Sequence, residues 1–129
     1  MSRKSRGIAG ERDLIHKFWG VGWACVRVAG SGSSQFPSPD IIASNNLRKF
    51  VIETKITRDN KKYFSSKEIR SLKFFAEKFG AEPWLSIKFF QTPWLFISTE
   101  DLRETSNNFV ISKEEALTKG LTFEEFTKD

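Results

Sequence analysis

The sequence predicts a mixed α/β domain, because helical and strand-like patterns alternate along its 129 residues. Two segments, residues 7–21 and 65–79, carry apolar side chains at helical spacing. The segments between and after them are short and rich in β-branched and aromatic residues, as strands are. Thirteen Phe and four Trp supply enough large rings for one core in so short a chain. We therefore expect a single domain over residues 1–129, with residues 1–6 as a basic, flexible N-terminal arm.

The first predicted helix, residues 7–21, carries an acidic residue on its apolar side. At about 100° per residue, Glu11 lies near the middle of the apolar arc, with Ile15 and Phe18 on either side of it. A charge in an apolar setting costs free energy unless it is paired or bound to a cation. Two interpretations are open: Glu11 is a functional carboxylate, or it is a helix-edge acid paired with a basic neighbour such as Arg12.

A strand and a loop rich in Gly and Ser follow this helix. Residues 23–29 have the composition of a strand, with Cys25 expected in the core. Because Cys25 is the only cysteine, an intrachain disulfide and a thiolate zinc site are both excluded. Residues 30–39 form a loop by composition. This loop is either a plain connector or a mobile flap whose hydroxyls and amides contact a substrate phosphate.

The pattern of residues 40–56 predicts a β-hairpin. Two apolar, β-branched runs, residues 40–44 and 49–56, flank the polar residues 45–48. If those polar residues form the loop of the hairpin, Ser44 pairs with Lys49. This register decides which side chains lie opposite each other along both strands.

Three charged residues interrupt the strands of this hairpin. Counting back from the Ser44–Lys49 pair places Asp40 opposite Glu53, with Cβ atoms about 5 Å apart. Because side chains alternate along a strand, Lys55 shares the face of Glu53 at a distance of about 7 Å. Two carboxylates this close can share one hard cation, with an ammonium group beside them. The arrangement of Asp40, Glu53 and Lys55 therefore predicts a cation site on this hairpin.

The second half of the chain predicts one helix, three strands and a final helical turn. Ser65 and Glu68 have the spacing of a capping box at the start of the helix, and Gly80 follows its end. The aromatic residues after Pro83 either fill the core or leave rings exposed for a dimer contact. The expected strands are residues 84–90, 94–98 and 109–111, and the final turn is capped by Thr122 and Glu125.

The charge is distributed unevenly along the chain. Residues 1–75 carry 15 Lys/Arg against 6 Asp/Glu, which gives +9, whereas residues 76–129 carry 6 against 10, which gives −4. A basic half suits a polyanion such as nucleic acid. The acids embedded in that half favour a metal-dependent nuclease over a plain phosphate-binding surface.

No apolar run in the sequence has the length of a membrane span, and no apolar stretch follows the basic N-terminus as in a secretory signal. We expect a cytoplasmic, nucleoid-associated protein without a membrane partner.

These motifs together resemble the archaeal Holliday junction resolvases, a branch of the restriction-endonuclease-like nucleases. The resemblance covers residues 7–126 and is strongest in residues 7–12, 26–33, 39–43 and 52–55. It implies a restriction-endonuclease-like fold, in which helices flank a mixed central β-sheet. It also implies a homodimer that cuts four-way DNA junctions with Mg²⁺, or with Mn²⁺ as a substitute. Replication or recombination proteins are candidate further partners.

The resemblance also assigns roles to individual residues. Asp40 and Glu53 would bind the metal, and Glu11 would complete the acidic cluster from the helix. Lys55 would orient or activate the attacking water and stabilise the charge that develops on the phosphate. Ser31 matches the serine of the family's mobile loop, which contacts the scissile region. Further residues expected along the DNA are Arg3, Lys4, Arg6, Arg12, Arg27, Ser33, Lys61 and Lys62.

Two alternative functions remain open at the level of the sequence. The first is another restriction or repair nuclease of the same fold that acts on duplex DNA. The second is a non-catalytic DNA-binding module on a decayed nuclease scaffold. A decayed site would lack at least one of the four central residues, and all of them are present: Glu11, Asp40, Glu53 and Lys55.

Overall fold

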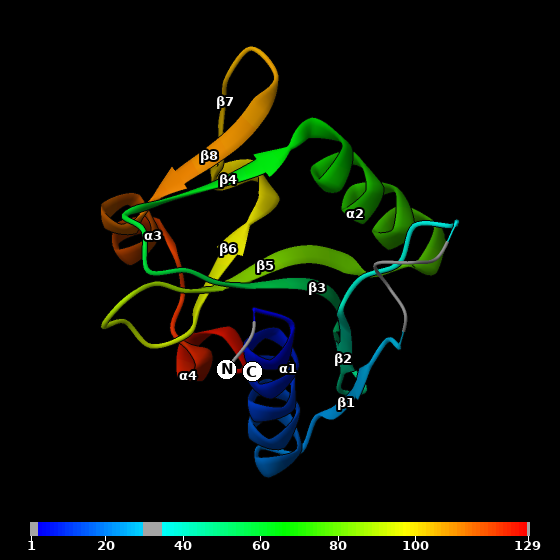
Figure 1. Cartoon of the computed structure of the whole chain (residues 1–129). Coiled ribbons are helices and arrows are strands. Elements are labelled where there is room, and N and C mark those ends of the chain that lie inside the picture. The colour runs from blue at the N-terminus through cyan, green and yellow to red at the C-terminus, as the bar shows by residue number, and fades with distance from the viewer. Residues whose placement is uncertain (1–2, 30–34, 129) are drawn as a thin grey trace.

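The computed structural model describes residues 3–29 and 35–128, the first four of them as backbone alone. Its centre is a five-stranded mixed sheet in the order β1-β2-β3-β5-β6 (Figure 1). Neighbouring strands are antiparallel except β3 and β5, which run parallel. The strands are β1 (Ala24–Arg27), β2 (Ile41–Ser44), β3 (Lys49–Ile56), β5 (Glu82–Lys88) and β6 (Leu95–Ser98).

A second, three-stranded antiparallel sheet has the order β4-β8-β7 and lies above the central sheet in Figure 1. No helix among the described residues is long and apolar enough to cross a bilayer. The strands of the second sheet are β4 (Lys61–Ser65), β7 (Arg103–Glu104) and β8 (Asn108–Ser112). The helices are α1 (Arg3–Gly20), α2 (Ser66–Phe79), the 3₁₀ turn η1 (Thr99–Asp101), α3 (Lys113–Lys119) and α4 (Phe123–Phe126).

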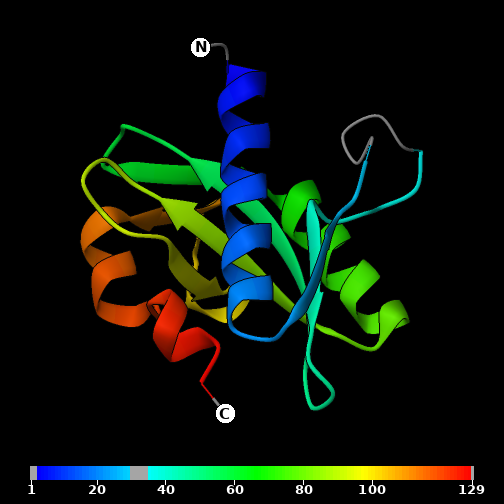
Figure 2. The ribbon, with the colours of Figure 1, turned by 90° about the horizontal axis from the view of Figure 1, so that it is seen from below.

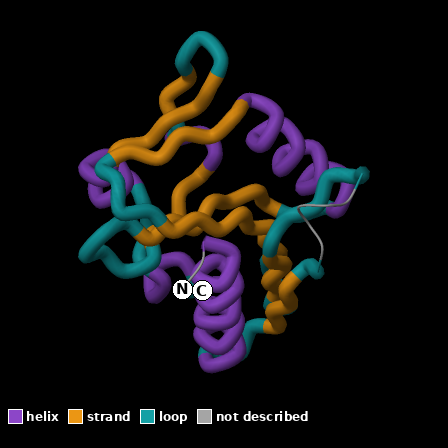
Figure 3. The backbone as a smooth tube through the Cα atoms, in the orientation of Figure 1, coloured by secondary structure: helices purple, strands orange, loops and turns teal. Residues whose placement is uncertain are grey.

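Helices cover both faces of the central sheet, so that two cores form (Figures 2 and 3). On one face, Leu14 and Phe18 of α1 pack with Phe126 of α4 and with the rings of the sheet. Phe126 stacks on Phe50 and on Phe96, with centroid distances of 4.2 Å in both pairs. On the other face, α2 packs against β3 and β5. Most of the aromatic rings after residue 83 therefore fill the core, although Phe90 stays exposed.

The predicted hairpin register is confirmed. Ser44 pairs with Lys49, and the ladder continues to Ile41 opposite Ile52. Alternation along β3 then sends Phe50 and Ile52 into the core on the α1 face, and Val51 into the core on the α2 face. The predicted capping box of α2 is also present, and Gly80 ends that helix in the left-handed region with φ 77°.

The N-terminal helix differs from the prediction. It begins at Arg3 instead of residue 7, so residues 3–6, which were expected in a flexible arm, are helical. It also buries a narrower stripe than expected: Leu14 and Phe18 are fully buried, whereas Trp19 is 57% exposed. The ring of Trp19 instead lies against the next strand, where its Nε1 donates to the carbonyl of Cys25 (2.9 Å). As predicted, Cys25 itself is a buried core residue.

Candidate functional site

Asp40 lies directly before β2 and is held from three directions. Its carbonyl accepts the N–H of Val28 (2.9 Å), and its own N–H donates to the carbonyl of Ile52 (3.1 Å). Its side chain crosses to β3, where Oδ2 accepts the N–H of Thr54 (3.0 Å) and lies 3.4 Å from the hydroxyl of the same residue. The carboxylate of Asp40 is therefore fixed beside Glu53, as the hairpin register predicted.

Glu53 is the most strongly perturbed carboxyl group of the site. The pKa of Glu53 is raised to about 8: burial contributes most, the negative charge of Asp40 adds to it, and Lys55 opposes both. More distant contributions from Glu68 and Glu11 also raise this pKa. A carboxyl group that resists ionisation among other acids gains most from a nearby cation.

Lys55 lies between two acids. Its Nζ is 3.9 Å from Oε2 of Glu53 and 3.3 Å from Oε1 of Glu68. Burial alone would lower the pKa of Lys55, but the charges of Glu68, Glu53 and Asp40 raise it above its ordinary value. The ammonium group is therefore charged at every physiological pH.

Glu11 approaches the same region from α1. Its Oε1 lies 3.2 Å from Nε of Arg27 on β1, and only 14% of its side chain is exposed. Burial and the charge of Asp40 raise the pKa of Glu11, while Arg27 lowers it. Glu11 therefore lies at the buried edge of α1, but its basic partner is Arg27 and not Arg12, which is exposed on the helix.

A close helix–sheet contact brings Glu11 to this position. A Cβ atom added to the preceding residue, Gly10, would lie 2.8 Å from Cδ1 of Ile56 and 3.2 Å from the ring of Trp94. Glycine at this position lets α1 lie close to Ile56 of β3 and to Trp94, which directly precedes β6. Trp94 is fixed in turn, because its Nε1 donates to Asp13 of α1 (2.9 Å).

The acids are electrostatically coupled without forming a preassembled metal cage. Among the residues that the structure describes, no three Asp, Glu, His or Cys side chains stand close enough together to hold one metal ion. Glu11 is turned toward Arg27, and Asp40 toward the backbone of β3. The close three-ligand pocket expected from the sequence is thus absent from this arrangement of side chains.

Four of the residues predicted to contact DNA have side chains that the structure describes. Arg12, Arg27 and Lys61 are exposed, and Lys62 is half-buried. Of these residues, Arg27 lies directly beside an acid of the site, through its ion pair with Glu11. The remaining predicted residues lie outside what the structure describes, as side chains or entirely: Arg3, Lys4, Arg6, Ser31 and Ser33.

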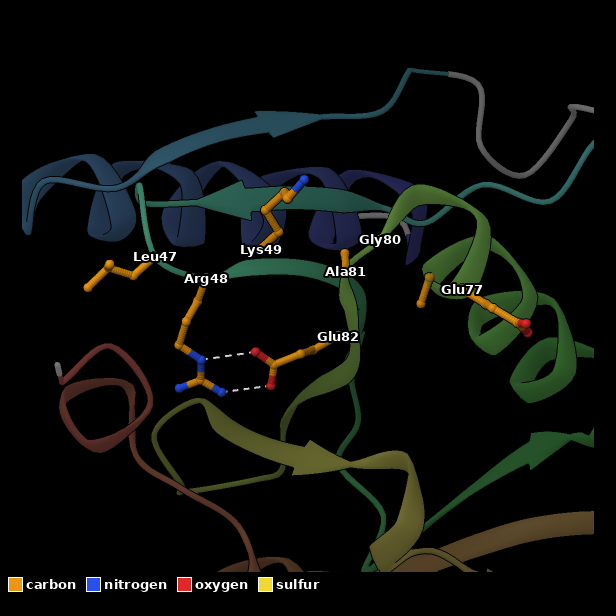
Figure 4. Close-up of a pocket in the computed structure, with 8 residues that line it drawn as sticks. Leu47, Arg48, Lys49, Glu77, Gly80, Ala81 and Glu82 are labelled. Atoms are coloured by element: carbon orange, nitrogen blue, oxygen red, sulfur yellow. Dashed lines mark hydrogen bonds and ion pairs between the residues drawn. The ribbon is translucent and has the colours of Figure 1, made fainter.

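A surface hollow elsewhere on the molecule does not coincide with these residues (Figure 4). In it, Arg48 and Glu82 form a two-pronged ion pair, with N–O distances of 2.9 and 2.7 Å. Arg48 precedes β3 and Glu82 begins β5, so the hollow lies at the end of the sheet away from Glu53 and Lys55. It is lined by Leu47, Arg48, Lys49, Ala76, Glu77, Gly80, Ala81 and Glu82.

Comparison with known proteins identifies the family. Residues 2–129 match the family model described as archaeal Holliday junction resolvase (Hjc). The chain belongs to the Hjc family. It is 41% identical over 110 residues to the crossover junction endodeoxyribonuclease Hjc of Archaeoglobus fulgidus, covering 85% of this chain and 81% of that protein. The Hjc of Sulfolobus acidocaldarius is 30% identical over 130 residues, covering 99% and 90%.

A solved structure supports the same relationship. The structure of Archaeoglobus fulgidus Hjc, described as a Holliday junction resolvase from an archaeal hyperthermophile, superposes with a TM-score of 0.85. The sequences are 36% identical, and the match covers 94% of each chain. These comparisons confirm the resemblance to the archaeal Holliday junction resolvases. They also confirm the predicted fold, a mixed central sheet flanked by helices. The function predicted from that resemblance, junction-resolving endodeoxyribonuclease, is confirmed as well.

The Hjc fold also brings two residues into the site that the sequence did not indicate. Thr54 binds Asp40 through its backbone N–H, and Glu68 of α2 contacts Lys55. The sequence assigned Glu68 to the capping box alone, which gave no sign that its second oxygen faces β3. The position of Thr54 between Glu53 and Lys55 was the only available signal for its contact with Asp40.

Proposed function

We propose that this chain resolves four-way DNA junctions by metal-dependent hydrolysis of phosphodiester bonds, acting as a homodimer. The observation that carries this proposal is the coupled group of Asp40, Glu53 and Lys55 on adjacent strands of a chain that belongs to the Hjc family. Acids beside one ammonium group, within a basic half of the chain, suit a phosphodiester better than a neutral or cationic substrate.

The donor set fits a hard divalent cation, Mg²⁺ with Mn²⁺ as a substitute. Every candidate ligand is a carboxylate oxygen, which such cations prefer over nitrogen or sulfur. The raised pKa of Glu53 supports this assignment, since a crowded carboxyl group that retains a proton near neutral pH favours any cation that can replace that proton. Asp40 and Glu53 would hold the ion, and Glu11 would join them when its side chain turns from Arg27 toward Asp40. When bound, the ion would activate water and neutralise phosphate charge.

Lys55 supplies a fixed positive charge to the reaction. Its ammonium group stays protonated because acids surround it, and 28% of the side chain remains accessible to a substrate. From there Lys55 donates hydrogen bonds to a non-bridging phosphate oxygen or to the attacking water. The backbone N–H of Thr54 on β3 would keep the carboxylate of Asp40 in place beside the ion.

Exposed basic residues would hold the DNA backbone. Arg27 is paired with Glu11 at the site, Arg12 is exposed on α1, and Lys61 is exposed on β4. Phosphate contacts of this kind position a nucleic acid without reading its bases, so junction selectivity would come from the shape of the DNA. Because the proposed substrate is chromosomal DNA, the enzyme would act in the cytoplasm, in association with the nucleoid.

The homodimer is supported by exposed aromatic residues on α2. Phe74 is 53% exposed and Phe79 is 43% exposed, although both belong to a helix whose other face is buried in the core. Phe79 also stacks on the half-buried Phe75, with a centroid distance of 5.4 Å. Large exposed rings lose unfavourable contact with water when a second copy of the chain covers them.

The central test is cleavage of a labelled four-way junction by Asp40→Asn and Glu53→Gln variants. Both changes keep the shape of the side chain and remove its negative charge. We expect each variant to bind the junction as tightly as the unchanged enzyme and to leave it uncut in Mg²⁺. Binding is measured by gel shift in Ca²⁺, and nicks are mapped on all four strands.

A matched control is Glu77→Gln, since Glu77 is an exposed acid of α2 that lines the distant hollow. This variant should cut at the normal rate. Full activity of Asp40→Asn or Glu53→Gln would refute the metal assignment. Equal cleavage of the junction and of a duplex of the same length would instead favour a duplex nuclease of the same fold.

A further inference from the structure

Lys55 is closer to an acid outside the predicted catalytic group than to the acid within it. Its Nζ lies 3.3 Å from Oε1 of Glu68 on α2, but 3.9 Å from Oε2 of Glu53 on its own strand. Only the contact with Glu68 satisfies the geometry of a hydrogen bond. The ammonium group is therefore directed by the helix and not by the strand that carries it.

The start of α2 fixes the carboxylate of Glu68. The N–H of Ser65 donates to Oε2 of Glu68 (2.8 Å), and the N–H of Glu68 donates back to Oγ of Ser65 (3.1 Å). This reciprocal capping box ties one carboxylate oxygen to the backbone. The other oxygen then has a defined position, and it is the oxygen that accepts the hydrogen bond from Lys55.

We propose that Glu68 is a positioning residue that holds the ammonium group of Lys55 away from Glu53, an inference that rests on the proposed function of Lys55. A lysine side chain has four rotatable bonds and moves readily toward the nearest negative charge. Without Glu68, that charge is Glu53, and a direct Lys55–Glu53 ion pair would occupy the oxygens that a metal ion needs. With Glu68 in place, the ammonium group is retained beside the site without blocking it.

The test separates the charge of Glu68 from its role in the helix cap. Glu68→Gln removes the charge but keeps an oxygen that can accept the N–H of Ser65, because capping boxes accept Gln as well as Glu. We expect this variant to keep its melting temperature and its affinity for the junction. Its single-turnover cleavage rate should fall on the order of tenfold, since a misplaced catalytic group costs rate and not binding.

Ser65→Ala is the matched control. It removes the hydroxyl that accepts the N–H of Glu68, but it leaves the charge of Glu68 and the backbone N–H of Ser65 intact. We expect this variant to melt at a lower temperature and to cleave at the rate of the unchanged enzyme. If Ser65→Ala slows cleavage as much as Glu68→Gln does, the helix cap and not the charge is responsible, and the proposal fails.

NMR spectroscopy of the protein without metal or DNA tests the same contact. The ¹³Cε and Hε resonances of Lys55, assigned by comparison with Lys55→Arg, report how firmly the ammonium group is held. In Glu68→Gln they should change, and in Ser65→Ala they should not. Unchanged resonances together with an unchanged cleavage rate in Glu68→Gln would overturn the role of Glu68. The proposed function would still stand in that case, as long as Glu53→Gln remains inactive.

Discussion

Glu53 shows at the residue scale how a site can be prepared for a cation. Its carboxyl group is buried beside Asp40, and its pKa of about 8 lies far above the ordinary value of 4.5. Between those two pH values the folded chain holds a proton that the unfolded chain has released, so the free energy of unfolding must fall as the pH rises. Below pH 4.5 both states are protonated, and above pH 8 both are ionised, so the change is confined to this window.

Replacing Glu53 by Gln should remove this pH dependence. Gln resembles a protonated Glu, so Glu53→Gln and the unchanged protein should be about equally stable near pH 4.5. As the pH rises to 8, the variant should become the more stable by a few kcal/mol, because it has no charge to bury. Urea unfolding at several pH values in EDTA measures the difference.

Mg²⁺ and the shape of the pH dependence both test this explanation of the stability difference. Excess Mg²⁺ should narrow the difference at pH 8, since the ion stabilises ionised Glu53 in the folded state alone. A stability difference that is constant from pH 4.5 to 8 would show that Glu53 has an ordinary pKa and that its burial has no electrostatic consequence.

The contacts of these residues within the hairpin are predictable from the sequence, whereas their contacts with other elements are not. The alternation of β3 and the length of the hairpin loop are local properties, and they placed Asp40 beside Glu53 correctly. The Glu11–Arg27 and Lys55–Glu68 contacts join different elements. Their formation depends on how α1 and α2 pack on the sheet, which the spacing of residues along the chain does not determine.

At the scale of elements, strongly patterned segments were predictable and weakly patterned ones were not. The sequence does not predict strand β4 (Lys61–Ser65), which lies at the edge of its sheet and buries one large side chain, Phe64. Nor does it predict helix α3 (Lys113–Lys119), which buries only Ala116, although Ser112 and Glu115 form a capping box at its start. Short elements of this kind gain their stability from tertiary contacts.

Two glycines of α1 should respond in opposite ways to the same substitution. Gly7 has open space around its Cα, so Gly7→Ala should stabilise the protein by about 0.5–1 kcal/mol through helix propensity. At Gly10 the methyl group would meet Ile56 and the ring of Trp94, which is buried and bound to Asp13. Gly10→Ala should therefore destabilise the protein by about 1 kcal/mol. Urea unfolding of both variants measures the contrast.

The same pair tests how α1 places Glu11. A helix displaced by the methyl group added at Gly10 would carry Glu11 away from Arg27 and Asp40, so Gly10→Ala should also cleave junctions more slowly, while Gly7→Ala cleaves normally. If both variants gain stability equally, α1 does not lie as close to β3 and β6 as the structure has it.

At the scale of the whole molecule, the exposed aromatic residues of α2 should control assembly. Phe74→Ser should shift the dimer toward monomers, since it removes a ring that is 53% exposed in the single chain and contributes little to its fold. Leu47→Ser is the control, because Leu47 is also an exposed apolar residue but lies in the β2–β3 turn. Sedimentation equilibrium distinguishes the two variants, and a monomeric unchanged protein would contradict the proposed homodimer.

The parallel pairing of β3 with β5 has a consequence for the protein while it is being synthesised. Because β4 and all of α2 lie between β3 and β5 in the chain, β3 is synthesised before the strand that pairs with most of its length. Glu68 and the neighbouring strand arrive only later. The arrangement of Glu53, Lys55 and Glu68 around a fully paired β3 can therefore form only after β5 has been synthesised.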